Sequence, residues 1–215
     1  MFADREDAGR QLAARLSHLK SESPVVLGLP RGGVVVAAEI AGALNAPLDV
    51  LVVRKVGAPM QPELALGAVI DGNPPRQVRN EDLIHTLHVE EAYLQEEAER
   101  QLAEARRRQE AYRRGRPAVD IAGRTVIVVD DGIATGATMK AALTALRQAD
   151  LKRLVAAVPV GPPDTIHDLQ GKVDELVCLD APPHFRAVGA FYGRFNQTTN
   201  EEVIALLDEA SADQA

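Results

Sequence analysis

Short apolar runs alternate with helix-like segments along this chain, and this alternation constrains the fold more than any other feature. Four such runs together contain only one charged residue, Asp49. They are residues 24–29 (PVVLGL), 48–53 (LDVLVV), 125–129 (TVIVV) and 154–160 (LVAAVPV). Strands of this kind are typical of a parallel sheet that is buried on both faces. Helical patterns follow the first, third and fourth of these runs, at residues 34–44, 138–148 and 164–170. The sequence therefore predicts an α/β fold, with a doubly wound, mostly parallel sheet flanked by helices.

The remaining segments extend this pattern. A stripe of alanine and leucine predicts an N-terminal helix over residues 4–20, and further strands are predicted at 65–70 and 173–179. Residues 71–80 are predicted to form a polar turn. Near the end of the chain, Thr199 and Glu202 have the spacing of a capping box at the start of a last helix.

One long helix is predicted over residues 81–114, where neither Gly nor Pro occurs. Its apolar stripe is narrow, so only one side can pack against the body or against a second subunit. Its charges are segregated, acidic from residue 90 to 99 and basic from 100 to 116. Two interpretations stay open: a solvated face with ion pairs between successive turns, or a surface for a specific partner.

The overall charge restricts the classes of partner. The chain has 24 Lys+Arg against 31 Asp+Glu, a formal net charge of −7, which disfavours nonspecific attraction to nucleic acid or an anionic bilayer. No run of 18 uncharged apolar residues is present, and charges occupy the N-terminal segment where a signal peptide needs an apolar run. The single cysteine, Cys178, cannot form an intramolecular disulfide. We expect a cytoplasmic protein with neither a membrane nor a nucleic-acid partner.

The chemistry is expected at the carboxyl ends of the strands, where open parallel sheets bind ligands. The strand at residues 125–129 runs directly into DDGIATGAT. The small residues from Thr135 to Thr138 offer closely spaced N–H groups and hydroxyls at a helix start, which suits a phosphate. Asp130 and Asp131 are suited to accept hydrogen bonds from sugar hydroxyls or to orient the waters of a metal ion. This segment therefore predicts a site for a sugar phosphate.

Three segments carry a resemblance to a known family. Residues 126–138 resemble the phosphoribosyl pyrophosphate (PRPP) signature of type I phosphoribosyltransferases, whereas the Walker A and dinucleotide-binding motifs are absent. Residues 27–33 (LGLPRGG) resemble the pyrophosphate loop of that family. The Arg54–Lys55 pair resembles the start of the mobile catalytic loop in the orotate branch. The resemblance covers residues 24–70 and 123–160 and implies a small bacterial phosphoribosyltransferase-domain protein.

The resemblance implies roles for individual residues, a cis peptide near Pro30 and Arg31, and Mg²⁺ as cofactor. It implies a catalytic set formed by Arg31, Arg54, Lys55, Asp130 and Asp131. The two aspartates would hold the metal, through water. It implies that substrate is bound by Pro30, Gly32, Gly33, Ile133, Ala134, Thr135, Gly136, Ala137 and Thr138.

The acceptor pocket is assigned less directly. An aromatic cluster near the end of the chain includes Phe185, Phe191 and Tyr192, and we predict that these three residues bind substrate. The cluster offers either a stacking face for a heterocyclic acceptor or the core of a small hood. Family members that use 6-oxopurines carry a carboxylate at the position of Ala134. Alanine there argues against hypoxanthine, guanine and xanthine, and is similar to the adenine branch.

The chain also departs from the family pattern. Residues 56–66 contain no Lys, Arg or His, so closure over the transition state would be weaker or need another segment. We expect one phosphoribosyltransferase-like domain over residues 1–215, with a helical insertion at 71–122 and a C-terminal hood and helix at 180–215. The insertion could cover the site, dock a second subunit through the 81–114 helix, or bind a partner.

Three functional hypotheses follow. The first is an enzyme of nucleotide metabolism that transfers the ribose 5-phosphate of PRPP to a base or another small nucleophile. The second is a non-catalytic sensor of PRPP or a nucleotide, which regulates a partner through the inserted helix. The third, a nucleic-acid-binding regulator, needs a basic face that only residues 100–116 could offer.

Overall fold

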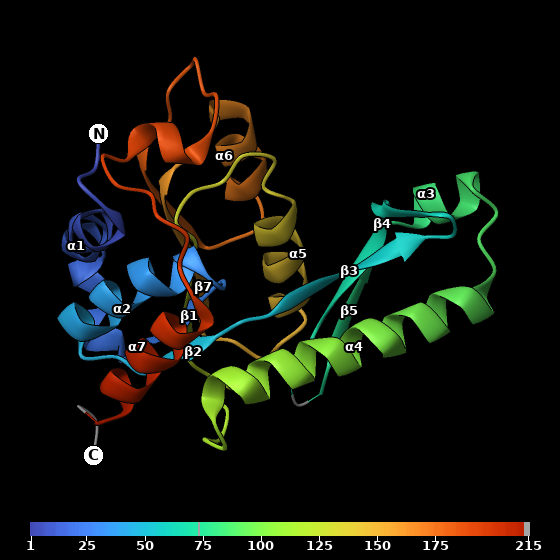
Figure 1. The fold of residues 1–215 in the computed structure, drawn as a ribbon, viewed down its shortest axis with the longest axis horizontal. Coiled ribbons are helices and arrows are strands. Elements are labelled where there is room, and N and C mark those ends of the chain that lie inside the picture. Colours follow the sequence, from blue (N-terminus) through green and yellow to red (C-terminus); the bar gives the residue numbers. More distant parts are fainter. Residues whose placement is uncertain (73, 213–215) are drawn as a thin grey trace.

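A parallel sheet of five strands lies at the centre of the larger part of the molecule, which we call the body (Figure 1). The computed structural model describes residues 1–72 and 74–212. The strand order is β2-β1-β6-β7-β8. The bounds are Val25–Gly28 for β1, Leu48–Val50 for β2, Thr125–Val129 for β6, Arg153–Val160 for β7 and Glu175–Asp180 for β8.

Helices cover both faces of this sheet, because successive apolar side chains in its strands point to opposite sides. Val26 and Ile127 pack with the helices of one face, and Val25 and Val126 with those of the other. The first face carries α1 (Arg5–Leu16), α2 (Gly32–Leu44) and α7 (Asn200–Ala212), and the second carries α5 (Ala137–Leu146) and α6 (Pro163–Gln170). The predicted α/β fold is confirmed.

A second sheet projects from the body as an arm (Figure 1). Its three antiparallel strands are β3 (Val53–Ala58), β4 (Gln61–Ile70) and β5 (Arg76–Arg79). Strand β4 was expected, at residues 65–70, in the main sheet, and this expectation is wrong. The chain reverses through a tight turn at Met60, whose φ is 63°, and so short a connection joins only antiparallel strands.

The predicted long helix is two helices, α3 (Glu81–Thr86) and α4 (Glu91–Arg113). They are separated at His88, which has a left-handed φ of 51°. The break lets Ile84 of α3 and Leu94 of α4 meet the same arm strands, where both are buried against Leu66. Tertiary packing thus ends a helix that contains no Gly or Pro. In the same region β5 replaces part of the predicted polar turn.

The arm consists of β3, β4, β5, α3 and α4. Its helices pack on strands that begin at Val53, so this unit starts earlier than the insertion expected at residues 71–122. The segment after β8 includes a short 3-10 helix, η2 (Val188–Phe191), and covers one end of the sheet. Helix α7, in contrast, buries Val203 and Leu207 in the core beside α2.

The predicted N-terminal and C-terminal helices are both present. Helix α1 continues into a 3-10 helix, η1 (Ser17–Glu22), and together they match the helix predicted over residues 4–20. The capping box before α7 forms, because Thr199 N donates to Glu202 Oε2 at 2.6 Å and Glu202 N donates to Thr199 Oγ1 at 3.1 Å. Among the described residues, no helix combines the length and apolar character needed to cross a membrane.

Candidate active site

The two predicted ligand loops meet at one edge of the sheet. Strands β1 and β6 are parallel neighbours, and Gly28 pairs with Val129 at their carboxyl ends. Leu29 N continues the ladder by donating to Val129 O at 2.9 Å. The segments that follow, residues 29–33 and 130–138, therefore begin side by side.

Glycine is required where these loops touch. A Cβ on Gly32 would lie 1.9 Å from Asp131 Oδ2, and one on Gly33 would lie 2.7 Å from Val129 O. The peptide between Pro30 and Arg31 is cis, as the resemblance implies. Because both glycines belong to the first turn of α2, the N-terminus of that helix stands directly beside the aspartate pair.

Asp131 is held from two sides, by Arg5, which the sequence did not indicate, and by Tyr192, which it indicated only as a substrate-binding aromatic residue. Arg5 Nε donates to Asp131 Oδ2 at 2.7 Å, and Tyr192 Oη donates to the Asp131 carbonyl at 2.5 Å. The Arg5 guanidinium also lies 3.9 Å from the centroid of the Phe195 ring. No motif marks Arg5 in the sequence, where it is one charge among several in a helical segment. The structure adds it as a positioning residue for Asp131.

Asp130 has a different environment. Burial and the adjoining carboxylate of Asp131 raise the pKa of Asp130 well above its usual range. Its Oδ1 accepts a hydrogen bond from Asp131 N at 2.9 Å. A group whose charged form is disfavoured in this way gains most from a hydrogen-bond donor or a cation placed beside it. The pair can therefore hold sugar hydroxyls or orient a hydrated ion.

The predicted phosphate loop is open to solvent at its tip. Gly136 adopts a left-handed φ of 68° as the residue before α5, and the side chains of Ala134, Thr135, Ala137 and Thr138 are exposed. The loop is fixed from below, because Thr165 Oγ1 donates to Ala134 O at 3.1 Å. An anion placed there would meet the amides of the first turn of α5.

Ile133 requires a correction. Its side chain is only 4% exposed, and its N–H donates to Val160 O at 2.9 Å. Ile133 therefore anchors the loop to the core, and the predicted contact with substrate does not fit its position.

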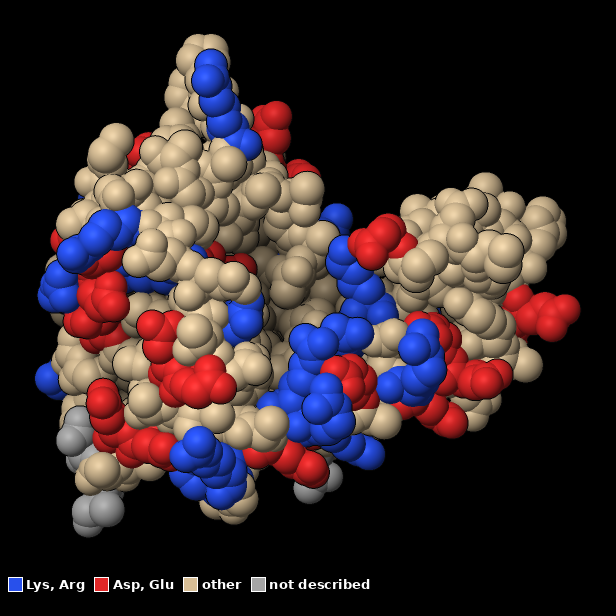
Figure 2. Space-filling view, viewed as in Figure 1, with Lys and Arg blue, Asp and Glu red and all other residues tan. Residues whose placement is uncertain are grey.

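Arg31 and Thr138 line a common cleft of about 780 Å³ between the body and the arm. Arg107 and Arg108 of α4 line it too, as do Asn200 and Glu201 of α7. Figure 2 shows the hollow between body and arm, with blue side chains gathered over the C-terminal half of α4 along its border. The α4 residues were missed as site residues, although the segregated basic stretch of residues 100–116 was a signal.

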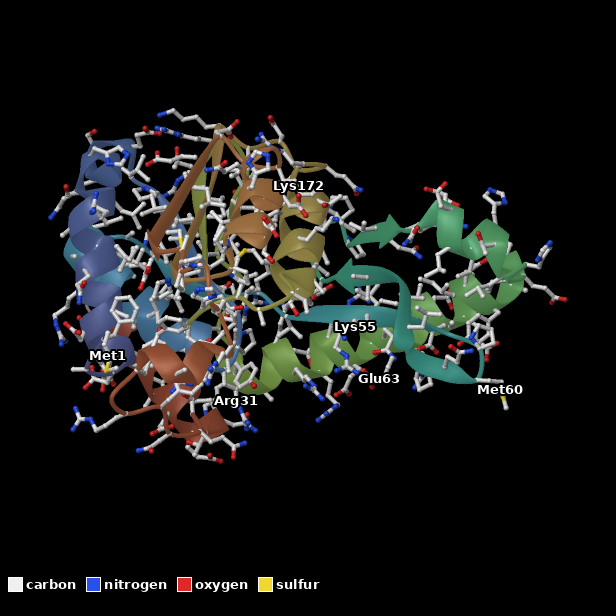
Figure 3. The ribbon with its side chains drawn as sticks, turned by 90° about the horizontal axis from the view of Figure 1, so that it is seen from above. Met1, Arg31, Lys55, Met60, Glu63 and Lys172 are labelled. Atoms are coloured by element: carbon white, nitrogen blue, oxygen red, sulfur yellow. The ribbon has the colours of Figure 1, made fainter. Side chains whose placement is uncertain are left out.

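Arg54 and Lys55 lie outside this cleft. Arg54 Nε donates to Gln101 Oε1 of α4 at 3.0 Å, and a neighbouring cavity of about 420 Å³ contains Arg54 together with Arg107. Lys55 points to the opposite side of β3, where its Nζ lies 4.0 Å from Glu63 Oε2 (Figure 3). The structure thus does not bring the Arg54–Lys55 pair together with Arg31.

The aromatic side chains of the predicted cluster pack mainly against one another and against Phe2. Phe185 and Phe191 stack with ring centroids 5.5 Å apart. The Tyr192 ring, 6% exposed, lies 5.4 Å from the Phe2 ring and 4.9 Å from the Phe195 ring. The predicted role of Tyr192 as a stacking face does not fit this burial, and its hydroxyl instead supports the main chain at Asp131.

A groove larger than the cleft between the body and the arm lies elsewhere. It measures about 1130 Å³, runs between α1, α2 and α7, and is lined by small residues such as Ala13, Ala38 and Gly42. None of the predicted site residues lines it. The carboxyl edge of the sheet therefore remains the candidate active site.

Comparison with known proteins agrees with this geometry. Residues 3–192 match the phosphoribosyl transferase domain family. Curated proteins from two strains of Mycobacterium tuberculosis, CDC 1551 / Oshkosh and H37Rv, are each 51% identical to this chain over 215 residues. Their printed names are "Putative phosphoribosyl transferase MT0597" and "Putative phosphoribosyl transferase Rv0571c". The chain is covered completely and spans about half, 48%, of the length of each.

A solved structure extends the comparison to the whole fold. The crystal structure of TT1426 from Thermus thermophilus has a TM-score of 0.86 and 48% sequence identity, and the match covers 97% of this chain and 98% of that one. The family match includes both ligand loops and the arm between them. The chain belongs to the phosphoribosyl transferase domain family.

Proposed function

We propose that this chain transfers the ribose 5-phosphate of PRPP to a nitrogenous base or another small nucleophile and releases pyrophosphate. The observation that carries the proposal is the contact of Gly32 and Gly33 with the Asp130–Asp131 pair at adjoining strand ends. A glycine loop, two carboxylates and the N-terminus of α2 adjoin there, and the N-terminus of α5 follows the aspartates along the chain. A cytoplasmic location and a role in nucleotide metabolism belong to the same proposal.

Each part of PRPP would have its own partner at this edge. The 5-phosphate would bind the amides and hydroxyls from Thr135 to Thr138, at the N-terminus of α5. The ribose hydroxyls would donate to Asp130 and Asp131. The pyrophosphate would lie against Arg31 and the N-terminus of α2. Binding energy from the phosphate, which does not react, would orient C1 of the ribose.

The reaction breaks the bond between C1 and the pyrophosphate oxygen and forms one between C1 and the nucleophile. Positive charge grows on the ribose and negative charge on the leaving pyrophosphate. Arg31 would stabilise the departing charge, since preorganised cations act most strongly where charge develops. Asp130 and Asp131 would stabilise the positive ribose from the opposite side. No covalent intermediate with the protein is needed.

The residues of the site fit a magnesium ion whose ligands would come mainly from the substrate. The described residues contain no group of three or more His, Cys, Asp or Glu that could hold a metal alone. Mg²⁺ is commonly bound by one or two carboxylates together with substrate phosphates, and the Asp130–Asp131 pair supplies that number. When bound, the ion would neutralise pyrophosphate charge as a Lewis acid.

The proposal is tested by measuring pyrophosphate release from PRPP and Mg²⁺ across a panel of bases and other small nucleophiles. Release with at least one acceptor is expected, and Asp131→Asn should reduce it by about 100-fold, because the ribose and the ion lose a charged partner. The matched control is Asp150→Asn, an exposed aspartate near the start of β6 rather than at its carboxyl end, which should retain activity. Equal rates for the two variants would contradict the assigned role of Asp131.

A PRPP or nucleotide sensor is the second candidate, and one observation favours it. Arg54 donates a hydrogen bond to Gln101 of α4 and Lys55 faces away. Two of the three cations in the predicted catalytic set therefore lie outside the cleft that contains Arg31. Tight binding of PRPP without turnover on any acceptor would select the sensor. Self-association through the 81–114 region stays a prediction.

A further inference from the structure

The hairpin formed by β3 and β4, which begins with the Arg54–Lys55 pair and resembles the mobile catalytic loop, carries no cation beyond that pair. Between Lys55 and Leu66 the only charged residue is Glu63, and the turn at its tip is occupied by Met60, which is 98% exposed (Figure 3). A pyrophosphate leaving group bears several negative charges, for which Arg31 alone is a weak complement. Any further positive charge must come from another segment that borders the cleft.

Helix α4 borders the cleft with arginines. Arg107 and Arg108 line the same cavity as Pro30 and Arg31, although about 75 residues of chain separate them. Arg107 also lines the neighbouring cavity that contains Arg54, so basic side chains run continuously along this side of the arm. Only Glu201 opposes them with a negative charge among the residues that line the cleft.

Glu104 holds both arginines through their inner nitrogens. Arg107 Nε donates to Glu104 Oε2 at 2.8 Å, and Arg108 Nε donates to Glu104 Oε1 at 2.7 Å. Arg107 Nη2 adds a bond of 2.9 Å to Oε1. These hydrogen bonds lower the pKa of Glu104 to about 2, so the carboxylate stays charged at neutral pH. One glutamate neutralises one of the two arginines, and a positive charge remains.

The outer nitrogens are available to a ligand. Arg107 Nη1 and both Nη atoms of Arg108 make no hydrogen bond to another residue in the described part of the chain. Their side chains are 70% and 47% exposed. Ion pairs of this kind on a helix surface add only about 0.3–0.5 kcal/mol to stability, so stability alone gives little reason for two arginines to share a glutamate beside a cleft.

From this placement we infer that Arg107 and Arg108 of α4 bind the pyrophosphate moiety of PRPP and supply the cations that the β3–β4 hairpin lacks. The inference rests on the proposed function. Guanidinium groups match phosphate oxygens with two parallel hydrogen bonds, and a planar pair anchored by Glu104 is oriented before the substrate arrives. The inserted helix thereby becomes part of the substrate site.

Arg106 provides a matched control on the same helical turn. Its Nε donates to Asp71 Oδ1 at 2.9 Å, and its side chain does not line the cleft. Removing it changes the net charge of α4 by the same amount as removing either neighbour. A difference between Arg106→Ala and either single alanine variant therefore reports position rather than overall charge, and the titration with ribose 5-phosphate controls for the second charge that the double variant loses.

The test is isothermal titration of the full chain with magnesium pyrophosphate, with PRPP and with ribose 5-phosphate. Arg107→Ala combined with Arg108→Ala should raise the Kd for pyrophosphate and PRPP by about 10- to 100-fold, the usual effect of losing charge-assisted hydrogen bonds. The Kd for ribose 5-phosphate, which lacks the diphosphate, should stay within about twofold of the wild-type value, as should every Kd of Arg106→Ala. The double variant Arg107→Lys with Arg108→Lys keeps both charges but loses the bidentate hydrogen bonds of the guanidinium groups. Its Kd for pyrophosphate and PRPP should lie between those of the wild type and the double alanine variant.

The outcomes separate this inference from the proposed function. If the wild-type chain binds PRPP but the double alanine variant matches Arg106→Ala, the inference is overturned and the proposed function stands. If the double alanine variant binds ribose 5-phosphate more weakly by the same factor as pyrophosphate, the arginines act through general electrostatic attraction and the inference is also overturned. If the wild-type chain binds neither PRPP nor pyrophosphate, both proposals are overturned.

Discussion

Asp130 and Asp131 are adjacent in the chain but have unequal partners. Asp131 receives a hydrogen bond from Arg5, which fixes the carboxylate against Gly32. Asp130 is partly buried beside a negative neighbour, and desolvation and this neighbour both raise its pKa. A carboxyl that is costly to ionise in the free protein is favoured once a cation or a set of donors arrives. The carboxyl group of Asp130 is therefore expected to favour ligand binding while it lowers the stability of the unliganded protein.

The first prediction concerns Asp130→Asn. Its melting temperature at pH 7 should exceed that of the wild type, because the amide removes a partly buried charge that Asp131 repels. The pKa of Asp130 is raised in the folded state above its usual 3.8, so the wild type loses stability as pH rises through the folded pKa. The advantage of the variant should therefore vanish below about pH 3.8, where the carboxyl is protonated in both states. PRPP affinity should fall by about 10- to 100-fold.

Thermal melts from pH 3 to pH 8, followed by circular dichroism, check this prediction. A variant that is less stable than the wild type at pH 7, or whose advantage grows on acidification, would contradict the assigned burial.

The second prediction concerns Gly32→Ala. The added Cβ would stand 1.9 Å from Asp131 Oδ2 and 2.7 Å from Arg5 Nε, so the carboxylate must leave its place. We expect a loss of PRPP affinity of about tenfold or more, measured by titration. Gly42→Ala is the control on the same helix, since its Cβ would meet nothing within 4 Å. That substitution should stabilise the chain by about 0.5–1 kcal/mol and leave binding unchanged.

At the scale of elements, local sequence pattern predicted the body better than the arm. Wholly apolar runs identified β1, β6 and β7, and their neighbours α2 and α5 followed from alanine-rich helical patterns. The meeting of Gly32 with Asp131 was predictable as well, because both follow strands of one parallel sheet. In the arm, the direction of β4 and the break at His88 are decided by contacts with segments far away in sequence.

The same distinction applies to the site. Glycines and aspartates at strand ends form a motif of fixed spacing, so the sequence indicated them. Arg5 and Arg107 reach the site from helices, and no local pattern marks which side of a helix will face a cleft. The aromatic cluster and the basic stretch of residues 100–116 drew attention to Tyr192 and Arg107, but they did not indicate the contacts that these residues make. Ile133 shows the converse: it lies inside the motif but is anchored in the core.

The third prediction concerns the junction of β3 with α4. Gln101 is 8% exposed; it accepts from Arg54 Nε at 3.0 Å and donates to Glu97 Oε1 at 2.9 Å. Gln101→Ala should reduce the free energy of unfolding by about 1–3 kcal/mol, because two partly buried charged groups lose a partner. Urea denaturation measures the change. Gln95→Ala removes an exposed glutamine that, within the described residues, bonds Glu99 alone, and its effect should stay below about 0.5 kcal/mol.

At the scale of the whole molecule, the cleft exists only while the arm stays attached to the body. Two links hold the C-terminal end of α4 in place. Arg113 donates two hydrogen bonds of 2.9 Å to the carboxylate of Asp49, and Tyr112 Oη donates to Asn200 Oδ1 of α7 at 3.1 Å. Arg107 and Arg108 lie between about one and two helical turns away from these links. Anchoring of the arm and geometry of the cleft are therefore coupled.

The last prediction concerns Arg113→Ala. Asp49 is 4% exposed, and without Arg113 its charge would keep only the backbone N–H groups of Val50 and Val119. Removal of one partner from a buried ion pair commonly costs about 3–5 kcal/mol, and we expect about 3 kcal/mol here because those two N–H groups remain. PRPP affinity should fall as well, since α4 loses its anchor beside the cleft. Arg114→Ala, next in the chain but exposed, is the control and should change neither quantity.

Urea denaturation and PRPP titration on the same preparations distinguish the possible results. Loss of stability together with loss of affinity supports an arm that shapes the cleft through its attachment. Loss of stability with unchanged affinity would show that substrate binds within the body alone, because a loosened α4 could not then be part of the site. The second result would also count against a role for Arg107 and Arg108, so the anchor and the arginines are tested from independent positions on one helix.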